Sequence, residues 1–260
     1  MASEFIKFSV EGAVGKITLN RPDKYNSFVR EMALQMQTAL DKCANDKRIR
    51  AIYITGEGKA FCSGQDLNEA LDPKGPGIKK IVDEHYNPIV KKIRTIEKPV
   101  VCAVNGVAAG AGANISLACD VVIAASSASF IQAFSKIGLI PDSGGTFFLP
   151  RLVGFGKASA LMMLGDKVSA MDAEKMGMIY KVVEDAKLQE EAFGIAKILS
   201  EMPTRGIGLT KKMLNQSMSN SLDQQLDAEG TEQTNAAATY DFNEGVKAFF
   251  EKRKPVFKGE

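Results

Sequence analysis

Residues 100–125, VVCAVNGVAAGAGANISLACDVVIAA, hold the clearest structural signal in the chain. Two apolar runs, at 100–104 and 120–125, are typical of buried strands, and between them lie a glycine-bearing loop at 105–114 and a short helix. The whole stretch is long enough to be considered as a membrane span. Glycines interrupt it, as do three polar residues: Asn105, Asn114 and Asp120. A strand, loop, helix and strand of an α/β domain therefore explain it better.

The same order of elements occurs elsewhere in the chain. Residues 5–19 predict a hairpin that turns at Glu11-Gly12, and a helix with one apolar face follows at 27–43. Residues 51–55, AIYIT, predict a buried strand that runs into the loop GEGKAFCSGQDL. Helical periodicity dominates from residue 158 on, at 158–164, 170–176, 188–199 and 203–217, with one or two more helices at 222–250, and we expect only helices after about Gly165. The pattern indicates an α/β core at residues 1–200 and a helical oligomerisation region at 201–260.

Composition excludes several classes of protein. The 260 residues are 45% hydrophobic and 25% charged, enough for a full core, and 33 basic against 31 acidic residues give a net charge of +2. That balance argues against a nucleic-acid partner. The four cysteines show no CxxC pairing, which favours free thiols, and the acids in MASEFIKFSVEG argue against a secretory signal. We expect a cytoplasmic protein without a membrane partner.

Two loops present main-chain N–H groups to a ligand. The first, Lys59–Leu67, is not a phosphate loop, because Ala60 stands where that motif needs Ser or Thr. The second, NGVAAGAGAN, is not a dinucleotide fingerprint, because Ile115 replaces its third glycine. A strand-ending turn or close helix–sheet packing would explain either loop alone. Together they offer the donors that an oxyanion hole needs.

Several motifs resemble the crotonase (enoyl-CoA hydratase/isomerase) superfamily. They are KAFCSGQDL, KPVVCAVNGVAAGAGANISLACDVVIAA, FIQAFSKIGLIPDSGGTFFLPRLVG and EGVKAFFEKRKPVF, and they span essentially the whole chain in the family's order. The resemblance implies an α/β spiral of ββα units with a C-terminal helical trimerisation region. It further implies an acyl-CoA thioester substrate, assembly as a homotrimer or dimer of trimers, and no metal or separate cofactor, since coenzyme A is part of the substrate.

The resemblance also implies roles for individual residues. The two oxyanion donors fall at Cys62 and Ala111, the latter between Gly110 and Gly112. Contacts to the substrate are implied for eight residues: Lys24, Ala60, Ser63, Gln65, Asp66, Leu67, Gly110 and Phe134. Lys24 would meet the phosphates, although solvation alone explains a surface lysine equally well. Phe249 and Lys252 would complete a neighbouring subunit's coenzyme A site, or are simply exposed.

The departures from the family's pattern bear on the reaction. The two glutamates with which family hydratases activate water correspond to Asn114 and Phe134, and neither is a general base. Asp142 lies where family isomerases keep their acid, although an Asp before Ser-Gly-Gly is also a common helix cap. The AAGAGAN and IGLIPDSGGT strings are similar to the branch of ring-1,2-epoxyphenylacetyl-CoA isomerases of bacterial phenylacetate catabolism, which also shift double bonds in enoyl-CoA chains.

Other functions remain to be weighed against an isomerase with Asp142 as catalytic acid/base. Enoyl-CoA hydration, a non-catalytic acyl-CoA-binding scaffold and a dehalogenase are alternatives; the last needs a Trp, and the chain has none. A serine hydrolase would use Ser63 or Ser143, but no GxSxG elbow exists. The single histidine, His85, is interpreted as a solvated helix residue because its neighbours are polar, and Tyr86 and Asn87 are pocket candidates.

Overall fold

The computed structural model describes residues 4–260. The first three residues of MASEFIKFSVEG, the segment used to argue against a secretory signal, lie outside the described residues. Two sheets form the core. The larger has six strands, in spatial order β1 (Ile6–Glu11), β2 (Val14–Leu19), β3 (Ala51–Gly56), β5 (Val100–Val104), β7 (Val121–Ala125) and β10 (Lys181–Val183). The smaller has four, in the order β4 (Ala60–Cys62), β6 (Val107–Ala109), β8 (Ser129–Ile131) and β9 (Lys167–Ser169).

The chain alternates between the two sheets. β3, β5 and β7 each continue, after a few residues, into a strand of the smaller sheet, and β5 and β7 are parallel neighbours in the larger one. β4, β6 and β8 are also parallel, whereas β1 with β2 and β8 with β9 are antiparallel. Each strand pair is followed by helix. This is the spiral of ββα units that the sequence predicts.

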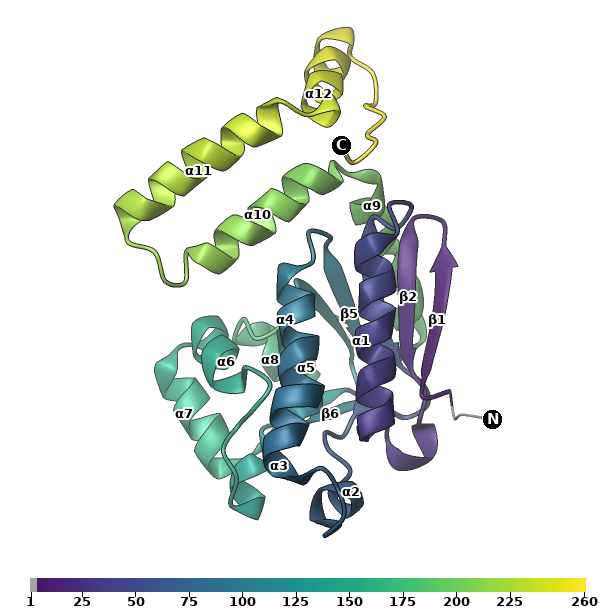
Figure 1. Cartoon of the computed structure of the whole chain (residues 1–260), viewed down its shortest axis with the longest axis vertical. Helices are drawn as coiled ribbons and strands as arrows, with labels where there is room; N and C mark the ends of the chain where they lie inside the picture. Colours follow the sequence, from purple (N-terminus) through teal and green to yellow (C-terminus); the bar gives the residue numbers. More distant parts are fainter. Residues whose placement is uncertain (1–3) are drawn as a thin grey trace.

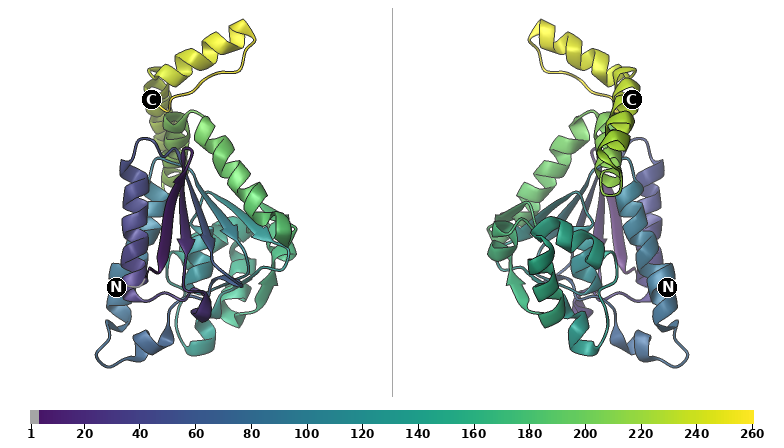
Figure 2. Two further views of the ribbon diagram at one scale, coloured as in Figure 1. Left: turned by 90° about the vertical axis from the view of Figure 1, so that its right-hand side faces the viewer. Right: turned by 90° about the vertical axis from the view of Figure 1, so that its left-hand side faces the viewer.

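Helices cover both faces of the larger sheet (Figures 1 and 2). The core helices are α1 (Arg30–Asn45), α2 (Leu67–Leu71), α3 (Gly77–Lys80), α4 (Asn87–Thr95), α5 (Ala111–Leu117), α6 (Gly145–Val153), α7 (Phe155–Leu164), α8 (Ala170–Lys175) and α9 (Leu188–Glu201). α1 forms because its apolar residues recur every three or four positions, and Met32, Met36 and Leu40 are fully buried. α1 and α4 lie side by side on one face, and α9 packs on the other.

The C-terminal helices α10 (Thr204–Gln216), α11 (Leu222–Ala237) and α12 (Tyr240–Glu251) extend away from the core as an arm (Figure 1). A buried ammonium anchors this arm. Lys211 Nζ on α10 donates to the Ile93 carbonyl at 2.6 Å and to the Asp120 carboxylate at 2.7 Å. The arm begins close to the predicted boundary at residue 200, although the two-part division itself stays a prediction.

Two expectations about the elements are wrong. The segment after Gly165 is not all helical, because β9 and β10 each add a three-residue strand to one of the sheets. The loop at 105–114 is shorter than expected, since it contains β6 and the start of α5. The stretch at 100–125 is otherwise the strand, loop, helix and strand predicted, and no helix within residues 4–260 is long and apolar enough to cross a membrane.

Candidate active site

The first predicted donor, Cys62, ends β4 and is fully buried. Burial raises the pKa of its thiol to about 12, so the side chain stays protonated and uncharged at neutral pH. Its sulfur accepts a bond from the Gly64 N–H at 3.4 Å. A thiol in this state is a poor nucleophile. The candidate functional group of Cys62 is therefore its main-chain N–H and not its thiol.

The second predicted donor, Ala111, is the first residue of α5. Gly110 precedes it with φ 54° and ψ −127°, a conformation that residues with a Cβ rarely adopt. This bend lets the chain leave β6 and enter the helix at once. The N–H groups of a helix's first turn have no acceptor within the helix, so the Ala111 N–H is available to a ligand.

Close packing brings these two segments together. A Cβ atom added to Gly112 would lie 2.3 Å from the Cys62 carbonyl oxygen, and one added to Gly64 would lie 3.5 Å from the Ala111 nitrogen. Glycine at both positions thus permits backbone-to-backbone contact between the end of β4 and the first turn of α5. The structure places the two predicted donors on adjoining backbone.

Asp142 lies in the turn before α6, and its side chain is half-buried. Its carboxylate accepts a bond from the Ser143 hydroxyl at 2.9 Å. Burial raises the pKa of the carboxyl group, more than the Ser143 bond lowers it. The helix-cap alternative is wrong: α6 begins after Gly144 with no side-chain cap, and only the Asp142 main-chain carbonyl receives the Gly145 N–H, at 2.8 Å.

The two positions that correspond to the hydratase glutamates are occupied by neutral, buried side chains. Asn114, on α5, donates to the Asp142 carbonyl at 2.9 Å and accepts from the Gln132 side chain at 2.7 Å. The Phe134 ring faces Gly110, 3.7 Å from where a Cβ would sit there. Asn114 thereby ties the Asp142 turn to the helix that begins with Ala111.

The residues predicted to contact coenzyme A gather along one segment beside Cys62. Lys24, Ser63 and Leu67 are exposed, and the Ser63 N–H donates to the Tyr25 carbonyl at 3.0 Å. The Ala60 carbonyl already accepts from the Asn26 amide at 2.8 Å. Their roles toward substrate stay predictions.

Two side chains of this segment are used inside the protein. Asp66 pairs with Arg21 at 2.7 Å and caps α2 through the Asn68 N–H. Burial disfavours the Asp66 charge, but these bonds outweigh it and lower the pKa. Gln65 bonds to Tyr86 and Glu69. Any contact that Gln65 or Asp66 makes to coenzyme A is therefore expected from the main chain.

The interpretation of His85 as a solvated residue is wrong. His85 is fully buried, and within residues 4–260 neither ring nitrogen has a hydrogen-bond partner. Burial lowers its pKa, so the imidazole is neutral at neutral pH. Its polar neighbours in the sequence concealed this burial because Ile81–Tyr86 form a π-helical turn, in which inward positions shift by one residue. The adjacent Tyr86 is also fully buried.

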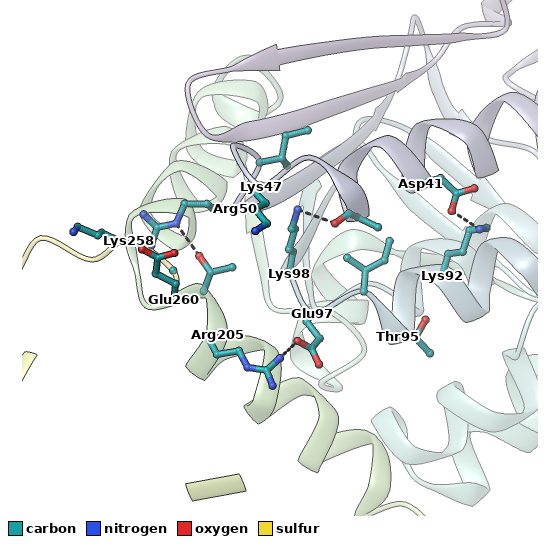
Figure 3. A pocket seen from close by; sticks show the side chains of 15 residues that line it. Asp41, Lys47, Arg50, Lys92, Thr95, Glu97, Lys98, Arg205, Lys258 and Glu260 are labelled. Carbon is teal, nitrogen blue, oxygen red and sulfur yellow. Dashed lines mark hydrogen bonds and ion pairs between the residues drawn. The ribbon is translucent and has the colours of Figure 1, made fainter. Parts of the chain in front are cut away.

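A charged cavity of about 620 Å³ lies away from these residues, between the C-terminal ends of α1 and α4 and the end of the chain (Figure 3). None of the predicted site residues lines it. Two of its cations are paired with acids, Lys92 with Asp41 and Arg205 with Glu97, and Lys98 donates to the Cys43 carbonyl. The arrangement of donors and acid around α5 is a better candidate for chemistry than this cavity.

The fold and this arrangement agree with the protein's relatives. A family model described as enoyl-CoA hydratase/isomerase matches residues 9–260. The chain belongs to this family. It is 48% identical over 260 residues to 1,2-epoxyphenylacetyl-CoA isomerase of Escherichia coli strain K12, covering 99% of each chain. It is 40% identical to a probable enoyl-CoA hydratase of Rhodobacter capsulatus, covering all of both.

Solved structures of the family show the same architecture. A putative enoyl-CoA hydratase/isomerase from Mycobacterium abscessus superposes with a TM-score of 0.93 at 36% identity, covering 98% of this chain and 100% of that one. The prediction of a crotonase-type fold is confirmed. The names of the relatives include both hydratases and isomerases, so membership of the family leaves the reaction to be argued from the residues of the site.

Proposed function

We propose that this crotonase is an acyl-CoA isomerase that works through a thioester enolate. The main-chain N–H groups of Cys62 and Ala111 bind the thioester oxygen, and Asp142 is the acid/base. The observation that carries the proposal is the contrast between Asp142 and the two hydratase positions. Asp142 is a half-buried carboxyl group with a raised pKa, whereas the side chains of Asn114 and Phe134 have no group that can act as a general acid or base.

The proposed reaction needs one carboxylate and no water. Asp142 removes a proton from the acyl chain, and the electron pair of the broken C–H bond moves into the thioester to give the enolate oxygen. Two N–H donors stabilise that negative charge, each contributing about 2.7–4 kcal/mol in comparable enzymes. The carboxylic acid then delivers a proton to another carbon, and the carbonyl re-forms. The product is an isomer, with no net oxidation and no further reactant.

Two acyl groups fit this chemistry: 2-(1,2-epoxy-1,2-dihydrophenyl)acetyl-CoA and 3-enoyl-CoA. The 48% identity to the Escherichia coli enzyme supports the first. A relative from Streptococcus mutans named trans-2-decenoyl-[acyl-carrier-protein] isomerase, 35% identical over 258 residues, supports double-bond migration. Neither acyl group calls for a metal, and among residues 4–260 no cluster of three or more His, Cys, Asp or Glu is placed to hold one.

The C-terminal arm supports assembly into a trimer or a dimer of trimers. Phe249 and Phe250 on α12 are 79% and 77% exposed, and an apolar cavity of about 530 Å³ opens between α10, α11 and α12. Apolar side chains exposed to this extent on one element are typical of a surface that a second subunit covers. Sedimentation equilibrium that gives a monomer at micromolar concentration would contradict this assembly.

The function is tested by supplying 3-enoyl-CoA in deuterated water and following both conjugation and deuterium uptake. We expect isomerisation by the wild type and a loss of roughly 10²–10⁴-fold in Asp142→Asn, which keeps the side chain's shape but removes its base. Asp185→Asn, on the surface, is the control. Unchanged isomerisation in Asp142→Asn would refute the role of Asp142, and rapid hydration of crotonyl-CoA would favour the hydratase alternative.

A further inference from the structure

One helical stretch contacts both halves of the candidate site. α3, the π-helical turn Ile81–Tyr86 and α4 follow one another without a break. In the π turn, the side chains of Ile81, His85 and Tyr86 are fully or almost fully buried. Isolated π turns are frequent at functional sites because they redirect a side chain that an α-helix would place elsewhere. Here Tyr86 is the last residue of the π turn, and its side chain is buried.

Tyr86 reaches the loop that follows Cys62. Its hydroxyl donates to the Gln65 side-chain oxygen at 2.8 Å, and its ring packs edge-on against Phe28 with centroids 5.8 Å apart. One turn later on the same face, Val90 lies 3.6 Å from where a Cβ of Gly144 would sit, beside the Asp142 turn. The helix therefore spans from the donor loop to the acid.

Gln65 connects Tyr86 to the loop that follows Cys62. Its amide nitrogen donates to Glu69 at 2.9 Å, so both ends of the side chain are held. On either side of Gln65, main-chain bonds fix the loop to Phe28: the Phe28 N–H donates to Gly64 at 2.7 Å, and the Asp66 N–H donates to Phe28 at 2.9 Å.

Gly64, next to Gln65, lies between the two donors. Its N–H donates to the Cys62 sulfur, and its Cα faces the Ala109 carbonyl and the Ala111 nitrogen. A displacement of Gln65 would be passed through Gly64 to both of the N–H groups proposed to bind the thioester oxygen.

We propose that Tyr86 is a positioning residue that, through its hydrogen bond to Gln65, fixes the separation of the Cys62 and Ala111 N–H donors. The inference rests on the proposed function. The phenol suits this role because it stays neutral: burial raises its pKa well above the ordinary value, and the nearby Cys62 and Asp142 add to that shift. A neutral phenol keeps its O–H and therefore keeps the bond across the whole working pH range.

The chain offers a matched control for removing this hydroxyl. Tyr53, on β3, is also fully buried, and its hydroxyl donates to the Gln189 side-chain oxygen at 2.6 Å, on the side of the sheet covered by α9. Tyr86→Phe and Tyr53→Phe each delete one part-buried hydrogen bond from a buried tyrosine to a glutamine side chain. The two variants should lose similar amounts of thermal stability. A difference in activity between them therefore reflects a change at the candidate active site and not a general loss of stability.

The experiment measures kcat, KM and the infrared carbonyl stretch of a bound acyl-CoA thioester. In Tyr86→Phe we expect kcat to fall roughly 10- to 100-fold, the magnitude that a small misplacement of catalytic groups causes, with KM nearly unchanged. The stretch, lowered in the wild type by the two donors, should return toward its value in solution. Tyr53→Phe should match the wild type in all three readouts.

A second variant tests the route through Gln65. Gln65→Met also removes the bond to Glu69, so it should lower kcat at least as much as Tyr86→Phe. The double variant should lose no more than Gln65→Met alone, because the Tyr86 hydroxyl then has no Gln65 side chain to act through. Losses that multiply in the double variant would overturn the inference, as would a Tyr86→Phe indistinguishable from Tyr53→Phe. A wild type that neither shifts the stretch nor isomerises any acyl-CoA would instead refute the proposed function, and the inference with it.

Discussion

The side-chain amide of Asn114 donates a hydrogen bond to the main-chain carbonyl of Asp142, at 2.9 Å. This bond links the helix that carries one proposed oxyanion donor, Ala111, to the turn that carries the proposed acid. A carboxylate at position 114 has no N–H with which to donate to the Asp142 carbonyl. The position can therefore carry either the catalytic glutamate of a hydratase or the hydrogen bond to Asp142, but not both. Gln132 fixes the orientation of the amide by donating to its oxygen.

Replacing Asn114 with glutamate is therefore expected to damage the site and not to create a hydratase. The buried carboxylate would face the Asp142 carbonyl oxygen, and the lost bond should lower the free energy of unfolding by about 1–3 kcal/mol. Urea unfolding and a crotonyl-CoA hydration assay measure both effects, with the exposed Asn235→Glu as control. Wild-type stability together with new hydratase activity would contradict this reading of the Asn114–Asp142 bond.

Asp142→Asn should increase stability at neutral pH. Burial raises the folded-state pKa of Asp142 above 3.8, so ionisation is disfavoured in the folded protein, and the resulting cost is fully present above that raised pKa. As the pH falls through the folded pKa the cost shrinks, and below 3.8 the carboxyl is protonated in both states and the cost is gone. Urea titrations across this range should show the advantage of the asparagine variant shrinking. An advantage that grows toward low pH would mean that the pKa is lowered.

The contact between Gly112 and Cys62 predicts a severe effect of one methyl group. In Gly112→Ala the new Cβ would meet the Cys62 carbonyl oxygen at 2.3 Å, so α5 and β4 must separate. We expect a loss of about 1–3 kcal/mol in stability from overpacking and a loss of enolate formation, measured by α-deuterium exchange. Gly156→Ala in α7 adds its methyl to open space and should be neutral or stabilising. Equal activity of the two variants would refute the proposed proximity of the donors.

The buried ammonium of Lys211 predicts that the arm depends on one ion pair. Lys211→Met leaves the Ile93 and Lys98 carbonyls without this donor and weakens the neutralisation of Asp120, which should cost about 3–5 kcal/mol. Lys79→Met removes an ion pair whose lysine is 89% exposed and should leave the unfolding free energy nearly unchanged. Chemical unfolding compares the two. Similar costs would show that the Lys211 contacts do not anchor α10.

Most helices and strands could be predicted from strong apolar periodicity in the sequence, whereas the shortest strands could not. β9 and β10 have three residues each, too few to show alternation, and they exist only because neighbouring strands offer hydrogen bonds. The donors proposed at Cys62 and Ala111 follow from motifs that are contiguous in sequence, and they stay a prediction. The Asn114–Asp142 bond joins residues 28 apart, and the burial of His85 depends on a π turn. Neither has a local signature.

The three proposed functional groups come from three successive turns of the spiral: Cys62 ends β4, Ala111 follows β6, and Asp142 lies in the turn after β8 and the 3-10 helix Ala133–Ile137. Because the first two act through the main chain, mutation of their side chains alters them little. The third acts through its side chain and is exchangeable. If these roles hold, such a scaffold can keep thioester activation through its main chain while single side chains change the reaction, in keeping with relatives named as hydratases and as isomerases.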